Sequence, residues 1–269
     1  MAMTRVQLLA IDVGNTNIVL GVFESDRLTK SWRIATFRER TADEMGVLVT
    51  QLFEQSGFDR TAVDGIILSS VVPPLTRPME DMSRQYFGRE PVTVDPAKNS
   101  GMPVLYTPPS DVGADRVVNA VAAYELYGRA KRIPLIVVDF GTATTFDAVS
   151  ADGEYVGGVI CPGIGISADA LFQRAARLPR VDVRKPDSII GTTTVTSMQA
   201  GLFFGYVSMV DGIVQRMRAE LPGGHRASCI ATGGMADILA AETKAIERVE
   251  PDLTLQGLRI IYQRAKTSA

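Results

Sequence analysis

The sequence has few of the residues on which catalysis and metal binding most often depend. Among 269 residues there is one histidine, His225, and there are two cysteines, Cys161 and Cys229. His225 follows two glycines in a polar stretch typical of a surface turn, so general-base chemistry would have to use a carboxylate. The cysteines lack C-x-x-C spacing and lie in apolar runs, which predicts free thiols in a reducing, cytoplasmic compartment.

Long hydrophobic runs and an excess of charge of one sign are also missing. No apolar run approaches the roughly 20 residues that span a bilayer, so we expect no membrane-spanning segment. A formal net charge of −2 offers no basic surface for nucleic acid. Residues 8–11 are too short for the apolar part of a secretory leader, and residues 1–5 resemble a short extension.

Two common nucleotide-binding signatures are absent. Without G-x-x-x-x-G-K-[ST], a Walker A loop is excluded. Without G-x-G-x-x-G after the first strand, a Rossmann cofactor site is disfavoured. The Gly-x-Gly at Gly163–Gly165 is better explained as the entry to a helix after Pro162.

What the sequence does contain is a repeat at about half its length. Residues 8–17 and 135–144 are each an apolar strand that ends in Asp-x-Gly and continues into small hydroxyl or amide residues. The matched aspartates are Asp12 and Asp139. The repeat predicts two similar lobes, each offering a carboxylate and a glycine turn to one shared nucleotide-phosphate cleft.

The periodicity predicts strands and helices in the same order in both halves. The predicted strands cover residues 6–13, 18–24, 28–36, 63–72 and 92–94, then 135–141, 143–150, 155–161 and 228–231. The predicted helices cover residues 41–57, 73–88, 110–128, 164–177, 197–219, 235–242 and 254–266. This pattern predicts an α/β architecture with mixed sheets, and the long loop at 95–110 is of the kind that is usually functional.

The glycine turns have the composition of phosphate-binding turns. Gly14 and Gly141 allow close backbone approach, and hydrogen-bond donors to phosphate oxygens come from the flanking amides and from Asn15, Thr16, Thr142 and Thr144. Asp12 is suited to holding Mg²⁺, directly or through water. A single Asp-x-Gly would more simply end a strand, but two copies at matched places favour function.

A candidate general base follows the long loop. Asp115, in Gly113–Arg116, stands at the start of a predicted helix, where a carboxylate also stabilises the helix dipole. Position alone leaves both roles open. Arg116 beside it favours a site that accepts a hydroxyl proton and holds a substrate carboxylate, so Asp115 is the candidate base.

Two further threonine-rich turns are ambiguous. Gly191–Thr194 precedes a helix with Ser197 and Met198 in its first turn, and for Thr192 and Thr193 a helix cap is a sufficient explanation. Thr232–Gly234 has the small residues that an adenine and ribose require, but it fits a plain strand-to-helix turn equally well.

Taken in order, these motifs resemble those of type III pantothenate kinases, from about Leu8 to the C-terminal helix. The resemblance implies two ribonuclease-H-like (actin-like ATPase) lobes with mixed five-stranded sheets flanked by helices, related by pseudo-twofold duplication. The lobes would cover residues 6–118 and 119–269. It also implies ATP-dependent phosphorylation of the primary hydroxyl of pantothenate to 4'-phosphopantothenate, the first step of coenzyme A biosynthesis, in a cytoplasmic homodimer.

The resemblance also assigns roles to residues. It implies ATP binding by Asp12, Val13, Gly14, Asn15, Thr16, Asn17, Ile18, Val19 and Thr142. It implies pantothenate binding by Tyr106, Gly113, Ala114, Asp115, Arg116 and, across the dimer interface, Thr194. Asp139 would hold K⁺ or NH₄⁺, which the family requires beside Mg²⁺ or a similar divalent cation. In the family, the residue before the threonine that matches Thr194 is often Asn, and in this chain it is Thr193.

Two alternatives share this fold. One is a kinase for another small molecule, because fold does not determine substrate. The other is a catalytically idle relative that acts as a regulatory accessory protein. The presence of Asp12, Asp115, Arg116 and Asp139 disfavours the idle relative.

Overall fold

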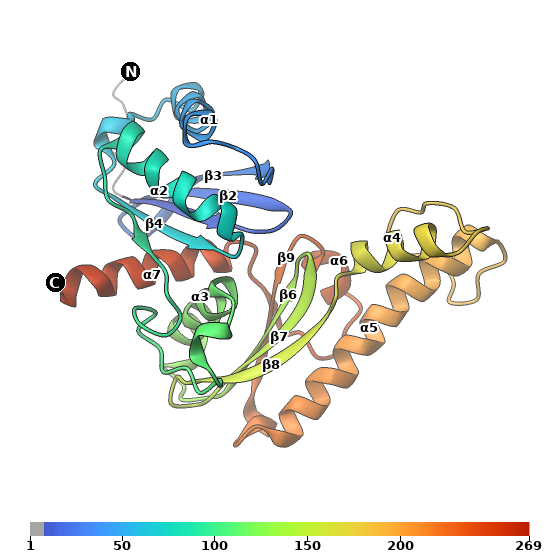
Figure 1. The fold of residues 1–269 in the computed structure, drawn as a ribbon. Helices are drawn as coiled ribbons and strands as arrows, with labels where there is room; N and C mark the ends of the chain where they lie inside the picture. The colour runs from blue at the N-terminus through green and yellow to red at the C-terminus, as the bar shows by residue number, and fades with distance from the viewer. Residues whose placement is uncertain (1–7, 269) are drawn as a thin grey trace. The chain divides into compact units, whose positions relative to one another are not determined.

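A computed structural model describes residues 8–268, so residues 6 and 7 of the first predicted strand lie outside the described part. The chain forms two compact units (Figure 1). Of the described residues, unit 1 comprises 8–122 together with 254–268, and unit 2 comprises Ala123–Leu253. This differs from the expected boundary between residues 118 and 119, which placed the C-terminal helix in the second lobe.

Unit 1 is built on a five-stranded mixed sheet with strand order β3-β2-β1-β4-β5. The strands are β1 (Leu8–Val13), β2 (Asn17–Glu24), β3 (Arg27–Ala35), β4 (Gly65–Ser70) and β5 (Val92–Thr93). β1 runs antiparallel to β2 and parallel to β4, so the central strand joins a hairpin to a crossover connection.

The helices of unit 1 begin and end where local chemistry predicts. α1 (Ala42–Gln55) starts at the Thr41–Glu44 capping box, in which each side chain accepts from the other residue's backbone N–H. α2 (Pro73–Phe87) opens on a proline and stops at Gly88, whose φ of 63° suits a residue without Cβ. A short 3₁₀ turn, η1 (Arg60–Ala62), precedes β4.

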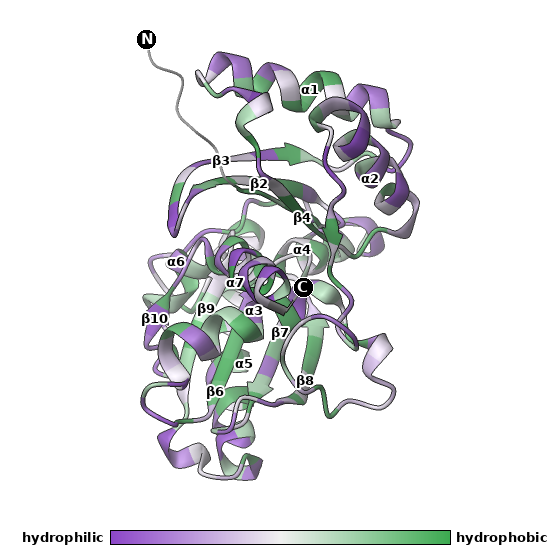
Figure 2. Ribbon diagram, turned by 90° about the vertical axis from the view of Figure 1, so that its left-hand side faces the viewer, coloured by the Kyte–Doolittle hydropathy of each residue, from purple (hydrophilic) through white to green (hydrophobic). Residues whose placement is uncertain are grey.

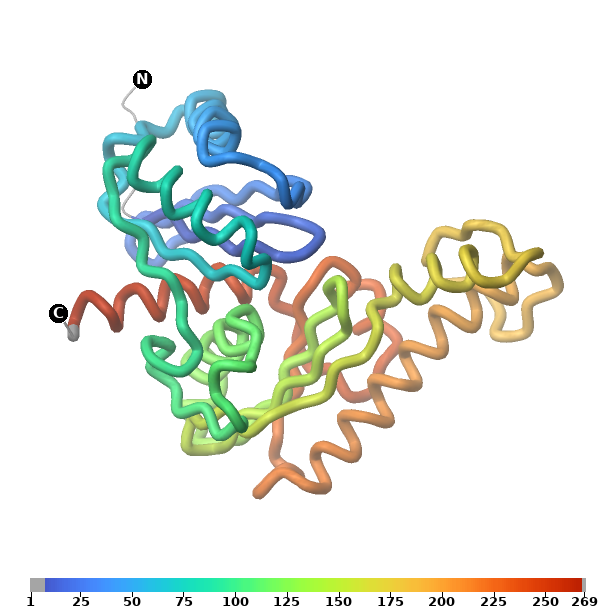
Figure 3. The backbone as a smooth tube through the Cα atoms, viewed as in Figure 1, coloured from blue at the N-terminus to red at the C-terminus, as the bar shows by residue number. Residues whose placement is uncertain are grey.

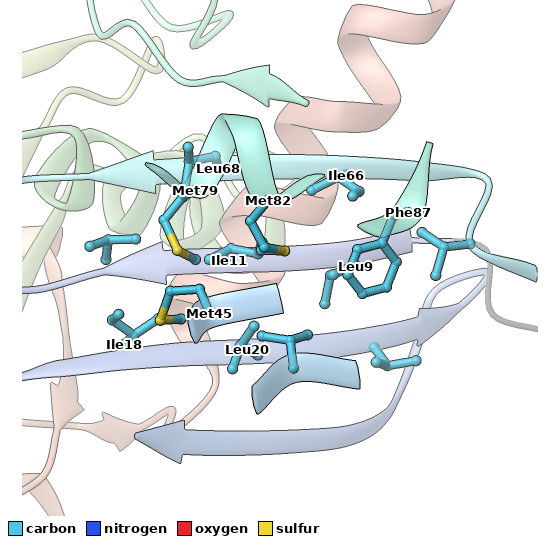
Figure 4. Close-up of a cluster of buried hydrophobic side chains, with 14 of the residues drawn as sticks. Leu9, Ile11, Ile18, Leu20, Met45, Ile66, Leu68, Met79, Met82 and Phe87 are labelled. Atoms are coloured by element: carbon cyan, nitrogen blue, oxygen red, sulfur yellow. The ribbon is translucent and has the colours of Figure 1, made fainter. Parts of the chain in front are cut away.

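α1 and α2 cover one face of this sheet with a hydrophobic core (Figure 4). Leu9, Ile11, Ile18 and Leu20 point from the strands towards side chains of the helices. The helices contribute Met45, Met79, Met82 and Phe87, among others. Each such side chain contributes roughly 1.5–3 kcal/mol of burial free energy, which makes the sheet a rigid support for its loops.

α7 (Leu253–Ser268) covers the opposite face of the same sheet, which is why it belongs to unit 1. Glycines on the sheet make room for it: a Cβ on Gly65 would overlap the Tyr262 hydroxyl, and one on Gly21 would lie 2.8 Å from Leu255. Arg259 donates to Asp26 at 2.6 Å in the β2–β3 turn. This packing joins residues about 200 or more positions apart, which sequence periodicity does not reveal.

The long loop and the helix after it differ from expectation in detail. Ser110 and Asp111 do not cap a helix but belong to a short 3₁₀ turn, η2 (Pro109–Asp111). α3 (Ala114–Ala123) begins after Gly113, and a single π-helical turn, η3 (Tyr124–Gly128), follows it. The intervening Val112 has extended backbone angles, so the 3₁₀ turn cannot continue into α3.

Unit 2 repeats the topology of unit 1, which confirms the duplication. Its sheet has the order β10-β9-β6-β7-β8. The strands are β6 (Leu135–Phe140), β7 (Ala143–Val149), β8 (Tyr155–Pro162), β9 (Ser228–Gly233) and β10 (Arg248–Val249). β6 pairs antiparallel with β7 and parallel with β9, as β1 does with β2 and β4. β10 was not predicted, because two residues carry no periodic signal.

Three helices complete unit 2: α4 (Ile164–Arg174), α5 (Thr194–Glu220) and α6 (Ala236–Ala240). Figure 2 shows the apolar character of the strands on which the hydrophobic core of this unit is built. Figure 3 shows α4, the following loop and the first half of α5 projecting away from the sheet of this unit. His225 lies exposed in the 3₁₀ turn η4 (Gly224–Arg226), in agreement with the surface turn predicted from the polar stretch around it.

The cysteines are free thiols, and burial raises the pKa of Cys229 to about 12. Within residues 8–268, none of the helices has both the length and the apolar character that a membrane span requires.

Candidate functional site

The first glycine turn connects β1 to β2 and is closed by a hydrogen bond from the Gly14 backbone N–H to the Asn17 carbonyl oxygen at 3.0 Å. A Cβ on Gly14 would lie 2.9 Å from that same oxygen, so the turn requires glycine. The side chains of Asn15 and Thr16 are exposed at its tip. A tight turn with exposed polar side chains has the form expected of a phosphate-binding segment.

Asp12 lies one residue before the end of β1, half-buried. Its register partners are Val19 on β2 and Ser69 on β4. Registered residues point to the same face of a sheet, so Asp12 and the buried Ser69 hydroxyl share one face. That is the face opposite the Leu9–Ile11 core.

Asp139 takes the equivalent place in unit 2, one residue before the end of β6. It pairs in register with Thr145 and Thr232, so a hydroxyl residue on the parallel neighbour again flanks the aspartate. The second turn is closed by the Gly141 N–H, which donates to the Ala143 carbonyl at 3.0 Å, and Thr142 is exposed.

The glycine that Asp139 most requires is Gly233, at the end of β9. Gly233 has a φ of 96°, and a Cβ there would lie 2.5 Å from Asp139 Oδ1 and 2.6 Å from the carbonyl group of Phe140. At Gly141 the same atom would lie at 3.5 Å, an ordinary contact. In the sequence, Gly233 fits an adenine site or a plain strand-to-helix turn; its proximity to Asp139 depends on the pairing of β6 with β9.

Asp115 lies in the first turn of α3, half-buried, and the backbone N–H of Arg116 donates to its Oδ1 at 2.8 Å. Burial raises the pKa of the Asp115 carboxyl, and this outweighs the opposing effects of the Arg116 backbone hydrogen bond and guanidinium. A Cβ on Gly113 would lie 2.6 Å from Asp115 Oδ1, so a glycine keeps the space that this carboxylate occupies. A carboxylate with a raised pKa is suited to accepting a proton near neutral pH.

The structure brings this segment to the same edge of the sheet as the first glycine turn. Gly113 lies against Val71, since a Cβ on it would be 3.7 Å from Val71 Cγ1. Val71 in turn donates its backbone N–H to the carbonyl of Val13, the residue after Asp12, at 3.0 Å. Two motifs about 100 residues apart therefore converge at the carboxyl end of β1 and β4.

Tyr106 is half-buried in the loop before η2. This loop is attached to α7, because Arg264 donates to the carbonyl oxygens of Gly101 at 3.1 Å and Ser100 at 3.4 Å. Tyr106 therefore belongs to the same unit as Gly113–Arg116, on an anchored loop.

In unit 2, Thr194 is the first residue of α5 and lies in an open groove of about 890 Å³ between α4 and α5. Thr193 caps α5 through a reciprocal box with Thr196, which explains why the helix begins three residues before its predicted start. Much of the remaining lining is apolar: Leu171, Leu178, Met198, Leu202 and Met209. Glycines and polar side chains complete it: Gly191, Thr192, Thr193, Ser197, Gly201, Gly205 and Tyr206.

The carboxylates near the two glycine turns suit cations that are held jointly by the protein and by a substrate. Among residues 8–268, His, Cys, Asp and Glu side chains form no cluster of three or more that could hold a metal. Mg²⁺ in kinases is commonly held by one or two carboxylates together with substrate phosphates, and Asp12 beside a phosphate-type turn fits that arrangement. Asp139 likewise offers a single carboxylate beside a glycine turn.

Comparison with known proteins gives a consistent result. A family model for type III pantothenate kinases matches residues 8–216. The type III pantothenate kinase of Myxococcus xanthus is 57% identical over 261 residues, covering 97% of this chain and 100% of that protein. That of Geobacter sulfurreducens is 55% identical over 257 residues, covering 96% and 98%.

Among solved structures, component A of (R)-2-hydroxyglutaryl-CoA dehydratase from Acidaminococcus fermentans is similar, with a TM-score of 0.55 and 14% identity over 97% of this chain and 99% of that one. This likeness concerns the fold, which is that of the actin-like ATPases. The family match and the two relatives extend over most or nearly all of the sequence, and the chain belongs to the type III pantothenate kinase family.

Proposed function

We propose that this protein transfers the γ-phosphoryl group of ATP to the primary hydroxyl of pantothenate and so forms 4'-phosphopantothenate, the first step of coenzyme A biosynthesis. Family membership and the names of relatives that are more than half identical support this assignment. The supporting observation in the structure is Asp115, a half-buried carboxylate of raised pKa at the same sheet edge as the Asp12 turn.

Asp115 acts as the proton acceptor. It takes the proton of the pantothenate hydroxyl as that oxygen forms a bond to the γ-phosphorus. The bond between the γ-phosphorus and the β–γ bridging oxygen breaks, and ADP leaves. The proton passes from Asp115 to solvent after product release.

The neighbours of Asp115 hold the acceptor. Arg116 binds the pantothenate carboxylate through its guanidinium, which suits a planar anion. Gly113, Ala114 and Tyr106 complete this part of the site. The segment Asp12–Val19, together with Thr142, binds ATP through backbone amides and small polar side chains.

Two cations complete the chemistry. Mg²⁺ would be held by Asp12, and K⁺ or NH₄⁺ by Asp139; when bound, they neutralise charge on the phosphoryl group. Each aspartate is held in place within its own sheet, because β1 and β6 are both paired with a strand on either side.

We further propose that the protein is a homodimer in which Thr194 contacts pantothenate bound to the partner. The α4–α5 groove supports this, because its lining is mainly apolar and includes the exposed side chain of Leu171. Further exposed apolar side chains lie in β8, in α4 and in the segment before α5: Val159, Ile160, Ile166, Phe172, Ile189 and Ile190. Large exposed apolar side chains in such number favour an interaction site. A Leu171→Glu variant should convert dimer to monomer in light scattering and lose activity. Gln173→Glu is the control, because it adds the same charge at an exposed position of α4 outside the groove lining and should leave both unchanged.

The acidic composition and free thiols support a cytoplasmic enzyme that binds neither membranes nor nucleic acid.

The decisive assay measures ADP release from Mg·ATP on addition of pantothenate, with and without K⁺. We expect pantothenate-dependent release that K⁺ stimulates, and a loss of about 10²–10⁴-fold in turnover for Asp115→Asn with ATP binding retained. Release with a different alcohol from a panel of acceptors, but not with pantothenate, would make the protein another small-molecule kinase. No release with any acceptor would favour a regulatory accessory protein.

A further inference from the structure

The connection between β3 and α1, residues 36–41, folds back onto the first glycine turn. The Thr36 backbone N–H donates to the Thr16 carbonyl oxygen at 3.0 Å. The Thr36 hydroxyl donates to the Gly14 carbonyl oxygen at 2.7 Å. Thr36 thus donates hydrogen bonds to two carbonyl oxygens of the turn and holds the loop beside the turn.

Two residues further on, Arg38 reaches the tip of the same turn. Its Nη2 donates to Asn15 Oδ1 at 3.3 Å, and its side chain is exposed. In the part of the chain that the structure describes, Arg38 forms no ion pair. Its charge is therefore balanced by no carboxylate, and most of its guanidinium donors remain available.

The other arginine of the loop has a different role. Arg40 stacks on the Phe37 ring at 4.8 Å, and its Nη1 donates to Met45 Sδ at 3.9 Å. The contact with Met45 attaches the loop to α1. Arg38 alone, of the two, is directed to the turn rather than to the body of the unit.

Beside the bound cations, a turn that holds a triphosphate gains from a positively charged side chain, and the side chain that supplies it in P-loop proteins is missing from this sequence. There is no Walker lysine. Backbone amides and neutral side chains can orient phosphate oxygens, but a guanidinium also neutralises them and donates two hydrogen bonds in one plane. Asn15 accepts from Arg38 through an uncharged amide oxygen, which a phosphate oxygen would outcompete.

From this geometry we infer that Arg38 is a nucleotide-binding residue, whose guanidinium contacts the β- and γ-phosphate oxygens of ATP held by the Gly14–Asn17 turn. The inference rests on the proposed ATP site but is independent of the acceptor. It extends that site to a loop that follows β3, about 20 residues beyond the turn.

The test is calorimetric titration of the full-length protein with Mg·ATP, and separately with adenosine, in the absence of any acceptor. For Arg38→Gln we expect the dissociation constant for Mg·ATP to rise about 10- to 100-fold, as for loss of a charge-assisted hydrogen-bond pair, with adenosine binding unchanged. Arg38→Lys should recover part of the loss, because it restores charge without the planar pair of donors.

Arg27→Gln is the matched control. Arg27 is also exposed, and it pairs with Glu24 at 2.9 Å at the opposite end of the β2–β3 hairpin. Its loss removes the same charge from the same unit and should leave Mg·ATP binding within about twofold of wild type.

Mg·ATP affinity in Arg38→Gln within twofold of wild type would overturn the inference, and so would an equal loss of adenosine binding, which would indicate a deformed turn. If Arg38 only stabilised the fold, Arg38→Gln would lower the melting temperature and leave the ratio of the Mg·ATP and adenosine dissociation constants unchanged. A wild-type protein that binds Mg·ATP but does not phosphorylate pantothenate would refute the proposed acceptor only, and one that binds no nucleotide would refute both.

Discussion

Gly113→Ala offers a direct test of the placement of Asp115. The added Cβ would lie 2.6 Å from Asp115 Oδ1, its closest neighbour, and 3.7 Å or more from the other atoms around it. The backbone of Gly113 is not in the left-handed region, so alanine is otherwise accommodated. The whole steric cost therefore falls on the carboxylate of the proposed base.

The magnitude follows from the distance. To reach ordinary contact, the carboxylate oxygen must retreat by about 0.8 Å, and a displacement of about 1 Å in a catalytic group can cost on the order of 10²-fold in rate. We expect turnover to fall about 100-fold, with the melting temperature within a few degrees of wild type. Affinity for Mg·ATP should be nearly unchanged.

The assay is steady-state ADP release with saturating ATP and pantothenate, alongside thermal unfolding. Gly165→Ala is the control, since a Cβ there meets no atom within 4 Å. Turnover of Gly113→Ala above about half the wild-type value would refute the assignment of Asp115. A large loss of thermal stability would show instead that the loop, rather than the carboxylate, had been displaced.

Four other outcomes can be measured. Because burial raises the pKa of Asp115, the acidic limb of the kcat/KM profile should lie above the range of an ordinary carboxyl, and Asp115→Asn should remove that limb. The same shift means that the folded state binds the Asp115 proton more tightly than the unfolded state does. The free energy of unfolding therefore falls as pH rises from the unfolded-state pKa of this carboxyl through its folded-state pKa. At pH 8, Asp115→Asn should accordingly unfold at a higher temperature than wild type. Gly233→Ala combines a φ of 96° with a Cβ 2.5 Å from Asp139 Oδ1, so it should cost about 1–3 kcal/mol in urea unfolding and weaken K⁺ stimulation. Thr36→Val removes the hydroxyl that donates to Gly14, and it should raise KM for ATP several-fold at a stability cost of about 1 kcal/mol.

Much of the architecture could be predicted because its signals are local. The capping box at Thr41, the proline at Pro73 and the glycine stop at Gly88 each act within one helical turn. Buried strands of six to eight residues were recognisable from their apolar runs. The boundaries failed where local chemistry was ambiguous, as at Ser110 and Asp111, whose side chains suit a 3₁₀ turn as well as a helix cap.

The candidate site could be predicted only in part, for the same reason. The repeated Asp-x-Gly identified Asp12 and Asp139, and the absence of a usable histidine directed attention to Asp115. The proximity of Gly233 to Asp139 and of Arg38 to Asn15 arises from strand pairing and a returning loop. Such contacts have no fixed spacing in a sequence.

By itself, then, the sequence determined that the chain is a duplicated α/β protein with an aspartate at the end of each central strand. It could do so because strand periodicity and turn composition repeat in both halves. Only the tertiary structure decided that α7 packs on the sheet of unit 1, and that Gly113 lies against Val71 at the edge where β1 ends. Those placements depend on which surfaces fit together after the chain folds, and shape complementarity between distant segments leaves no periodic trace in the order of residues.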